Sequence, residues 1–161
     1  MDPKLAAKFI EGFVFILTVG AGLFALFMVV DLLRLRKKGT IYRGGIGQWS
    51  WVAHRITGVG ILAFLIGHIV DTFAVGFGPE AYNEAVSLYK QWWFAPFEVM
   101  LIGAVVYHAF NGLRIILFDF WPTLALKQKT FAYVQLVLTV AAFTPAAIIM
   151  LANAWEHSPF S

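Results

Sequence analysis

Cysteine is absent from this chain of 161 residues, and charged residues make up only 13% of it. Without cysteine the chain can form no disulfide, ligate no iron–sulfur cluster through thiolates and attach no c-type haem covalently. So few charges beside 60% hydrophobic residues exclude an ordinary soluble domain and indicate an integral membrane protein. The formal net charge of +3 is typical of Lys and Arg collected in cytoplasmic loops, so we expect no nucleic-acid partner.

Four apolar runs are each long enough to cross a hydrocarbon layer of about 30 Å. We predict an all-α integral membrane protein, a helical bundle in one domain (residues 1–161), with transmembrane helices at about 12–33, 51–75, 97–118 and 130–155. The lipid bilayer is thus the first partner that the sequence implies.

The loops between these runs predict the orientation of the chain. The stretch from Arg34 to Gly45 is basic and carries glycine, so we expect it to be a cytoplasmic loop. Both termini then lie outside. The segment 76–96, with its Gly, Pro and Trp residues, is expected to be an outer loop with an interfacial aromatic belt.

A histidine, His108, lies deep in the third apolar run. At helical spacing it shares a face with Ala104 and Gly112, which leaves room for a flat group. An ionisable ring in hydrocarbon needs a partner, and imidazole is the usual axial ligand of haem iron. A b-type haem is therefore one interpretation of His108, and a hydrogen bond to a neighbouring helix is the other.

The second run carries two more histidines, His54 near its cytoplasmic start and His68 toward its far end. Fourteen helical residues separate them by about 21 Å, so they lie at opposite membrane levels. Beside His54, the cation of Arg55 suits a haem propionate or a quinone oxygen, or else snorkels to the interface. Arg114 carries the same two interpretations, and we rank it below Arg55 as a propionate partner.

Two motifs on consecutive helices resemble a known family. They are Ser50-Trp51-Val52-Ala53-His54-Arg55-Ile56-Thr57-Gly58, and Tyr107-His108 followed by Asn111-Gly112-Leu113-Arg114 and Asp119. Together they resemble the cytochrome b556 membrane anchor, the C subunit, of succinate dehydrogenase (respiratory complex II). The resemblance covers about Thr40 to Pro122. The run from Arg43 to Thr72 is most similar to the actinobacterial diheme type that works with menaquinone.

This resemblance implies a function for the whole chain. Succinate would be oxidised on a flavoprotein subunit, and electrons would pass through an iron–sulfur subunit to haem b and a quinone held here. The chain would also anchor the soluble subunits to a bacterial cell (inner) membrane as a multi-pass subunit. It would be a subunit of an enzyme that does not itself hold the succinate site.

The resemblance also implies roles for individual residues. His108 would be an axial ligand of haem b, with the other ligand supplied by a second membrane-anchor subunit. His54 and Arg55 would lie near the propionates and the quinone, on the side that faces the iron–sulfur subunit.

Two departures from the family pattern matter. Family members usually have three helices, so the helix at about 12–33 is an additional N-terminal element. The family's serine stands three residues before its histidine, whereas Ser50 stands four before His54 and Trp51 takes its place. A contact between Ser50 and quinone is therefore in question, and Trp51 is expected to shape or block that pocket.

His68 is not explained by a single haem. We favour a second haem b near the outer side, ligated by His68 and a histidine of the partner subunit. The alternative is a hydrogen bond from His68 to Asp71, one turn away. Asp71 in turn is either a proton relay beside an outer quinone or a solvated aspartate at the helix end.

Two other functions remain open at this stage. One is the cytochrome b anchor of another membrane oxidoreductase, and the other is a haem-free structural or transport subunit that uses its intramembrane charges. The chain has no Gly-x-Gly-x-x-Gly fingerprint of a dinucleotide site.

Overall fold

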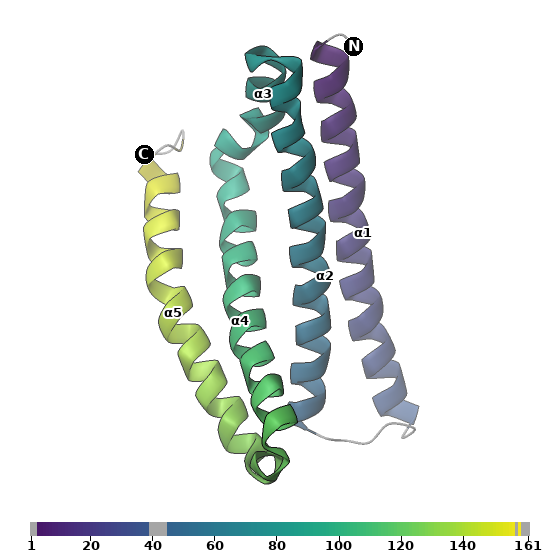
Figure 1. Ribbon diagram of the computed structural model, residues 1–161, viewed down its shortest axis with the longest axis vertical. Helices are drawn as coiled ribbons and strands as arrows, with labels where there is room; N and C mark the ends of the chain where they lie inside the picture. Colours follow the sequence, from purple (N-terminus) through teal and green to yellow (C-terminus); the bar gives the residue numbers. More distant parts are fainter. Residues whose placement is uncertain (1–2, 39–44, 157, 159–161) are drawn as a thin grey trace.

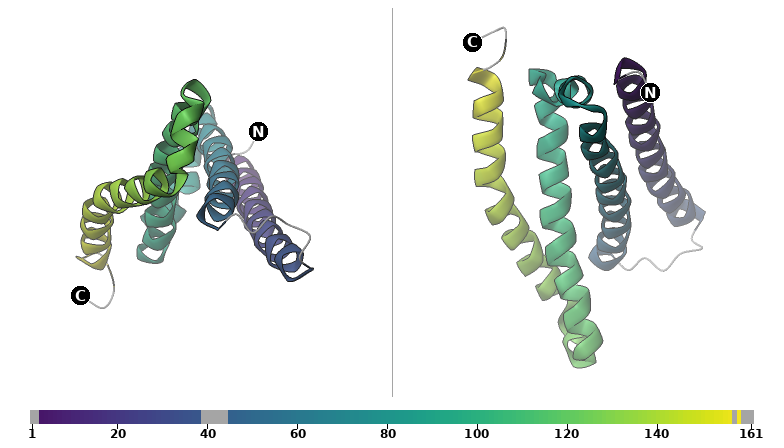
Figure 2. Two further views of the ribbon diagram at one scale, coloured as in Figure 1. Left: turned by 90° about the horizontal axis from the view of Figure 1, so that it is seen from below. Right: turned by 45° about the horizontal axis from the view of Figure 1, so that its top comes forward.

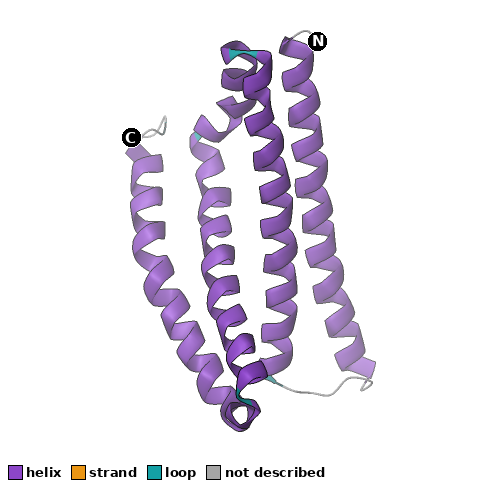
Figure 3. Ribbon diagram, in the orientation of Figure 1, coloured by secondary structure: helices purple, strands orange, loops and turns teal. Residues whose placement is uncertain are grey.

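The computed structural model describes residues 3–38, 45–156 and 158, and these are helical almost throughout (Figure 3). Four long helices, α1 (Pro3–Lys38), α2 (Ile46–Phe73), α4 (Ala95–Phe120) and α5 (Gln128–Glu156), make up most of the chain. Each of the four is long and apolar enough to cross a membrane. The prediction of an all-α membrane protein with four transmembrane helices is therefore confirmed.

The long helices extend beyond the apolar runs that predicted them. α1 begins at Pro3 rather than near residue 12, and it ends at Lys38 rather than near 33. Hydropathy marks only the part of a helix that lies in hydrocarbon, whereas the hydrogen-bonded ladder continues into the charged flanks. Of the basic loop predicted from Arg34 to Gly45, the part up to Lys38 belongs to α1, and residues 39–44 lie outside the described residues.

The expected outer loop is folded into short helical pieces. A 3₁₀ turn (Ala74–Phe77), α3 (Pro79–Ala85) and two further 3₁₀ turns (Val86–Lys90 and Trp92–Phe94) connect α2 to α4. Gly78 separates the first two pieces with φ of 105°, a conformation that favours glycine, and Pro79 then starts α3. These pieces form a cap over one end of the molecule (Figure 1).

The additional N-terminal helix α1 is held against α2 and this cap. Ile10 packs in a buried cluster with Ala74 and Ala85. Farther along, a Cβ atom built on Gly67 of α2 would lie 3.5 Å from Cγ2 of Val14. The two helices therefore approach closely where Gly67 presents no side chain.

The four long helices form an open V rather than a ring around one axis, as Figure 2 shows from below. α1 makes its contacts with α2 and the cap, while α5 packs on α4 and reaches the start of α2. The beginning of α1 and the end of α5 lie at the same end as α3 (Figure 1), as four crossings require. Following the predicted orientation, we call this the outer end, and the opposite end, where α2 begins and α4 ends, the inner end.

Candidate functional site

A polar stripe on α4 faces a serine of α2 near the inner end. Tyr107, Asn111 and Arg114 follow one another at helical spacing and so share a face of α4. Ser50 Oγ donates to Asn111 Oδ1 at 2.7 Å and accepts from Arg114 Nη2 at 2.9 Å. The Tyr107 hydroxyl donates to the Ser50 carbonyl oxygen at 3.2 Å. The hydrogen bonds of Ser50 thus hold α2 against α4, and the residue is only 6% exposed.

Next to this stripe the two inner histidines stack on each other. The ring centroids of His54 and His108 are 3.9 Å apart, and the ring planes differ by 11°. Each ring rests near a glycine of the opposite helix. A Cβ atom built on Gly58 would lie 3.0 Å from Cε1 of His108, and one on Gly112 would lie 3.6 Å from Cε1 of His54. The close approach at Gly58 is what lets the imidazole of His108 fit between the helices, whereas the distance at Gly112 is an ordinary contact.

The hydrogen bonds of His108 determine which ring nitrogen carries its proton. Nδ1 lies 3.1 Å from the carbonyl oxygen of His54 and 3.1 Å from Oγ1 of Thr57. Because a carbonyl oxygen only accepts, Nδ1 is the protonated nitrogen and Nε2 keeps its lone pair. Nε2 has no hydrogen-bond partner among the described residues. A histidine that donates from one nitrogen to a carbonyl and offers the other is in the state that binds a metal.

Several buried polar atoms around this stack are unpaired. Within the described part of the chain, Nδ1 of His54, Nδ2 of Asn111, and Nε and Nη1 of Arg114 have no hydrogen-bond partner. Leaving donors of a charged group unsatisfied is costly. A carboxylate accepts charge-assisted hydrogen bonds from guanidinium N–H groups, so either unpaired donor of Arg114 suits an acid group beside the histidines.

These features fit a b-type haem. His108 offers a nitrogen in the ligating tautomer, and Arg114 offers donors for a propionate. Among the residues described there is no group of three or more His, Asp or Glu side chains that could hold a bare metal ion.

Arg55 lies outside the stack. Its guanidinium carbon sits 3.9 Å from the ring centroid of Trp51, on an exposed face of α2. Successive helical residues are rotated by about 100°, which turns Arg55 away from the face of His54. Of the two arginines, Arg114 is therefore the one on the side of the imidazoles, while the ranking of Arg55 above it as a propionate partner stays a prediction.

His68 lies on an exposed face of α2 far from this site. Its ring stacks on Phe64 with centroids 5.7 Å apart. His54 contacts His108, and His68 is fourteen residues farther along the same helix, or about 21 Å. The structure therefore excludes one iron shared by His68 and His108.

Asp71, near the outer end of α2, is buried at 5% exposure, so its interpretation as a solvated aspartate is wrong. Its carboxylate accepts a hydrogen bond from the Tyr89 hydroxyl, which belongs to the 3₁₀ turn Val86–Lys90. The described residues show no hydrogen bond between Asp71 and His68. Burial, followed by the contact with Asp71, raises the pKa of the Tyr89 phenol, which keeps it protonated as the donor.

Tyr89→Phe should destabilise the outer end, because it leaves a buried carboxylate without its donor. We expect a loss of about 1–3 kcal/mol, seen as a lower apparent melting temperature of the purified complex. Tyr82→Phe is the matched control, since Tyr82 is 39% exposed and lies on α3 in the same cap. Equal melting temperatures for both variants would contradict the role given to Tyr89.

Sequence reasoning assigned no role to Thr57, Tyr107, Asn111 or Tyr89. Three of them carry a signal that could have been used, namely polar side chains at helical spacing within an apolar span. Tyr89 carries no such signal, because only the fold of the cap brings it to Asp71.

Comparison with known proteins agrees with this geometry. Residues 33–148 match the family model described as "Succinate dehydrogenase/Fumarate reductase transmembrane subunit". The chain belongs to this family. It is a multi-pass membrane subunit of a succinate dehydrogenase-type complex. The matched region includes α2, α4 and most of α5 but only the end of α1, in agreement with a three-helix family core and an additional N-terminal helix.

Individual relatives carry names of the same kind. The succinate dehydrogenase 2 membrane subunit SdhC of Mycobacterium tuberculosis is 36% identical over 122 residues, which is 76% of this chain and 90% of that protein. The succinate dehydrogenase hydrophobic membrane anchor subunit of Halobacterium salinarum is 33% identical over 94 residues, 58% of this chain and 72% of that protein. The membrane subunit is therefore similar to bacterial and archaeal anchors.

Proposed function

We propose that this membrane subunit binds haem b through His108 and passes electrons from the iron–sulfur subunit to a quinone, while it anchors the soluble subunits. The observation that supports this most directly is the hydrogen bond from Nδ1 of His108 to the His54 carbonyl oxygen, at 3.1 Å. It orients the ring and leaves Nε2 as the ligand. The other iron ligand would come from a partner anchor subunit.

The surrounding residues position the ligand and balance charge. The His54 carbonyl and Thr57 hold the imidazole of His108 in one orientation, and Arg114 directs its unpaired donors to a propionate carboxylate. The haem, when bound, supplies one-electron acceptance and donation. Since this chain has no cysteine, the iron–sulfur clusters belong to another subunit, and the flavin and succinate site belong to the flavoprotein.

His68 is proposed as the ligand of a second haem b. Its ring is on an exposed face of α2 and makes no hydrogen bond with the described residues, so a partner subunit can reach it. At about 21 Å from the inner histidines, it extends the path toward the outer end. Asp71 remains a proposed proton relay for a quinone there.

The quinone is proposed to be menaquinone. Trp51 and Arg55 form an exposed cation–aromatic pair at the inner end, and the Arg55 guanidinium can donate to a quinone carbonyl. Ser50 is a poor quinone contact in comparison, because its hydroxyl is already bonded to Asn111 and Arg114.

A pyridine haemochrome assay on the purified complex tests the proposal by counting haem b per flavin. We expect two haems in the native complex and one in each of His108→Ala and His68→Ala. His54→Ala is the comparison variant, because it removes the stacked ring but keeps the backbone carbonyl that holds His108, and it should retain more haem than His108→Ala. No haem in the native complex would leave a haem-free anchor. Loss in His54→Ala but not in His108→Ala would overturn the ligand assignment.

A further inference from the structure

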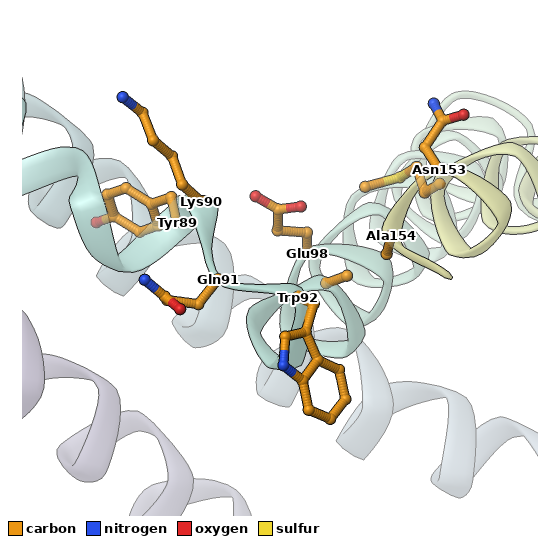
Figure 4. A pocket seen from close by; sticks show the side chains of 9 residues that line it. Tyr89, Lys90, Gln91, Trp92, Glu98, Asn153 and Ala154 are labelled. Atoms are coloured by element: carbon orange, nitrogen blue, oxygen red, sulfur yellow. The ribbon is translucent and has the colours of Figure 1, made fainter. Parts of the chain in front are cut away.

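A cavity of about 260 Å³ opens at the outer end between the turn before α4, α4 itself and α5. Figure 4 shows Glu98 rising between Lys90 on one side and Asn153 on the other. The cavity belongs neither to the inner histidine site nor to the exposed face around His68. Its wall includes one cation, one anion and two amide side chains beside apolar residues, so it can accept a ligand that carries charged groups.

The carboxylate of Glu98 is the charged group of this cavity that needs a partner. It is half-buried, and it makes no ion pair or hydrogen bond with any described residue, Lys90 included. Its place in the first turn of α4 stabilises the carboxylate, because the helix dipole is positive there. Two opposite charges that line one cavity without pairing suit a ligand that itself carries both signs.

A second cavity of about 170 Å³ adjoins the first and shares Trp92, Ala95 and Ala154 with it. Its other walls are mainly apolar, from Pro96, Leu151 and Trp155. Tryptophan is enriched where the polar interface of a membrane meets hydrocarbon. Two neighbouring cavities, one with charged side chains on its wall and one with mainly apolar walls, suit an amphiphile with a charged head and a hydrocarbon tail.

We propose that these two cavities bind an outer-leaflet phospholipid of the phosphoethanolamine headgroup class. The primary ammonium, with its three donors, binds Glu98, and the phosphate lies beside the ammonium of Lys90. An acyl chain lies in the apolar cavity. An oxidised quinone fits less well, because its carbonyl groups only accept hydrogen bonds and leave the Glu98 carboxylate without a donor.

Native mass spectrometry of the whole purified complex tests this with phosphatidylethanolamine and phosphatidylglycerol added at equal concentration. We expect the native complex to prefer phosphatidylethanolamine about tenfold, and Glu98→Gln to abolish that preference, since one charge-assisted hydrogen bond is lost. Lys90→Gln should weaken both lipids. The control is Glu80→Gln, an exposed carboxylate in the first turn of α3, which should leave the preference unchanged.

A further variant and two competitors complete the test. Ala154→Trp fills space common to both cavities and should reduce binding of both lipids. Haem content should stay unchanged in every variant, which separates this site from the proposed haem function. Four results would each overturn the assignment. The first two are equal binding of the two lipids and an unchanged preference in Glu98→Gln. The others are displacement of the bound lipid by menaquinone and its displacement by free phosphoethanolamine.

Discussion

Gly58→Val is expected to remove the proposed inner haem and to lower electron transfer from succinate to quinone by about a hundredfold, the scale seen when the shell around a metal ligand is disturbed. A Cβ atom at Gly58 would lie only 3.0 Å from Cε1 of His108, and valine adds two methyl groups beyond it. His54 stacks on one face of the imidazole, with centroids 3.9 Å apart, and so closes one direction in which the ring could move away. The ring must therefore leave the orientation in which Nε2 is offered.

The same helices provide a graded set of controls. Around Gly60 no heavy atom lies within 4 Å of an added Cβ, so Gly60→Val should retain haem and turnover. At Gly112 the nearest atom is Cε1 of His54, at 3.6 Å, so Gly112→Val should have an intermediate effect. For each of the three variants, haem per flavin and the reduced-minus-oxidised spectrum measure how much haem is retained. Similar losses in Gly58→Val and Gly60→Val would contradict it.

Arg114→Met should weaken haem retention roughly thirtyfold, which corresponds to about 2 kcal/mol for hydrogen bonds to a charged group. The guanidinium uses Nη2 on Ser50, at 2.9 Å, and keeps Nε and Nη1 for the proposed propionate. Methionine has a similar length but no donor, so it removes these bonds with little change in volume. The rate of haem loss to an external acceptor measures the effect on the purified complex.

Two further variants separate charge from position. Arg55→Met removes a cation that lies exposed over Trp51, so it should change haem loss little and act on quinone reduction instead. Arg114→Lys keeps the charge but loses the planar guanidinium, so its rate of haem loss should lie between those of the native complex and Arg114→Met. If Arg55→Met releases haem as fast as Arg114→Met, the propionate contact belongs to Arg55.

Much of the fold could be predicted from the apolar runs, because the thickness of hydrocarbon sets the length of a spanning helix. The ends of those helices could not be predicted in this way. The first helix was expected at about 12–33, whereas α1 continues from Pro3 to Lys38. The cap between α2 and α4 was also missed. Its short helices depend on packing against α1 and on the backbone freedom of Gly78, which no hydropathy pattern reports.

The residues of the candidate site could be predicted in part. His54, His108 and Arg114 were identified because charged or ionisable groups in apolar helices are costly and need partners. The sequence did not predict which arginine lies on the side of the histidines, since Arg55 and Arg114 look alike in sequence and differ only in the direction in which they face. Helical rotation separates Arg55 from the stack and places Arg114 on Ser50.

The sequence by itself determined what kind of protein this is, through the absence of cysteine, the four apolar runs and two polar motifs, because these depend on composition and local spacing. Only the tertiary structure decided how the motifs meet. Ser50 and Asn111, separated by 61 positions, form a buried hydrogen bond, and His108 takes its tautomer from the carbonyl of His54. Such contacts depend on how two helices rotate and approach each other, which local spacing does not specify.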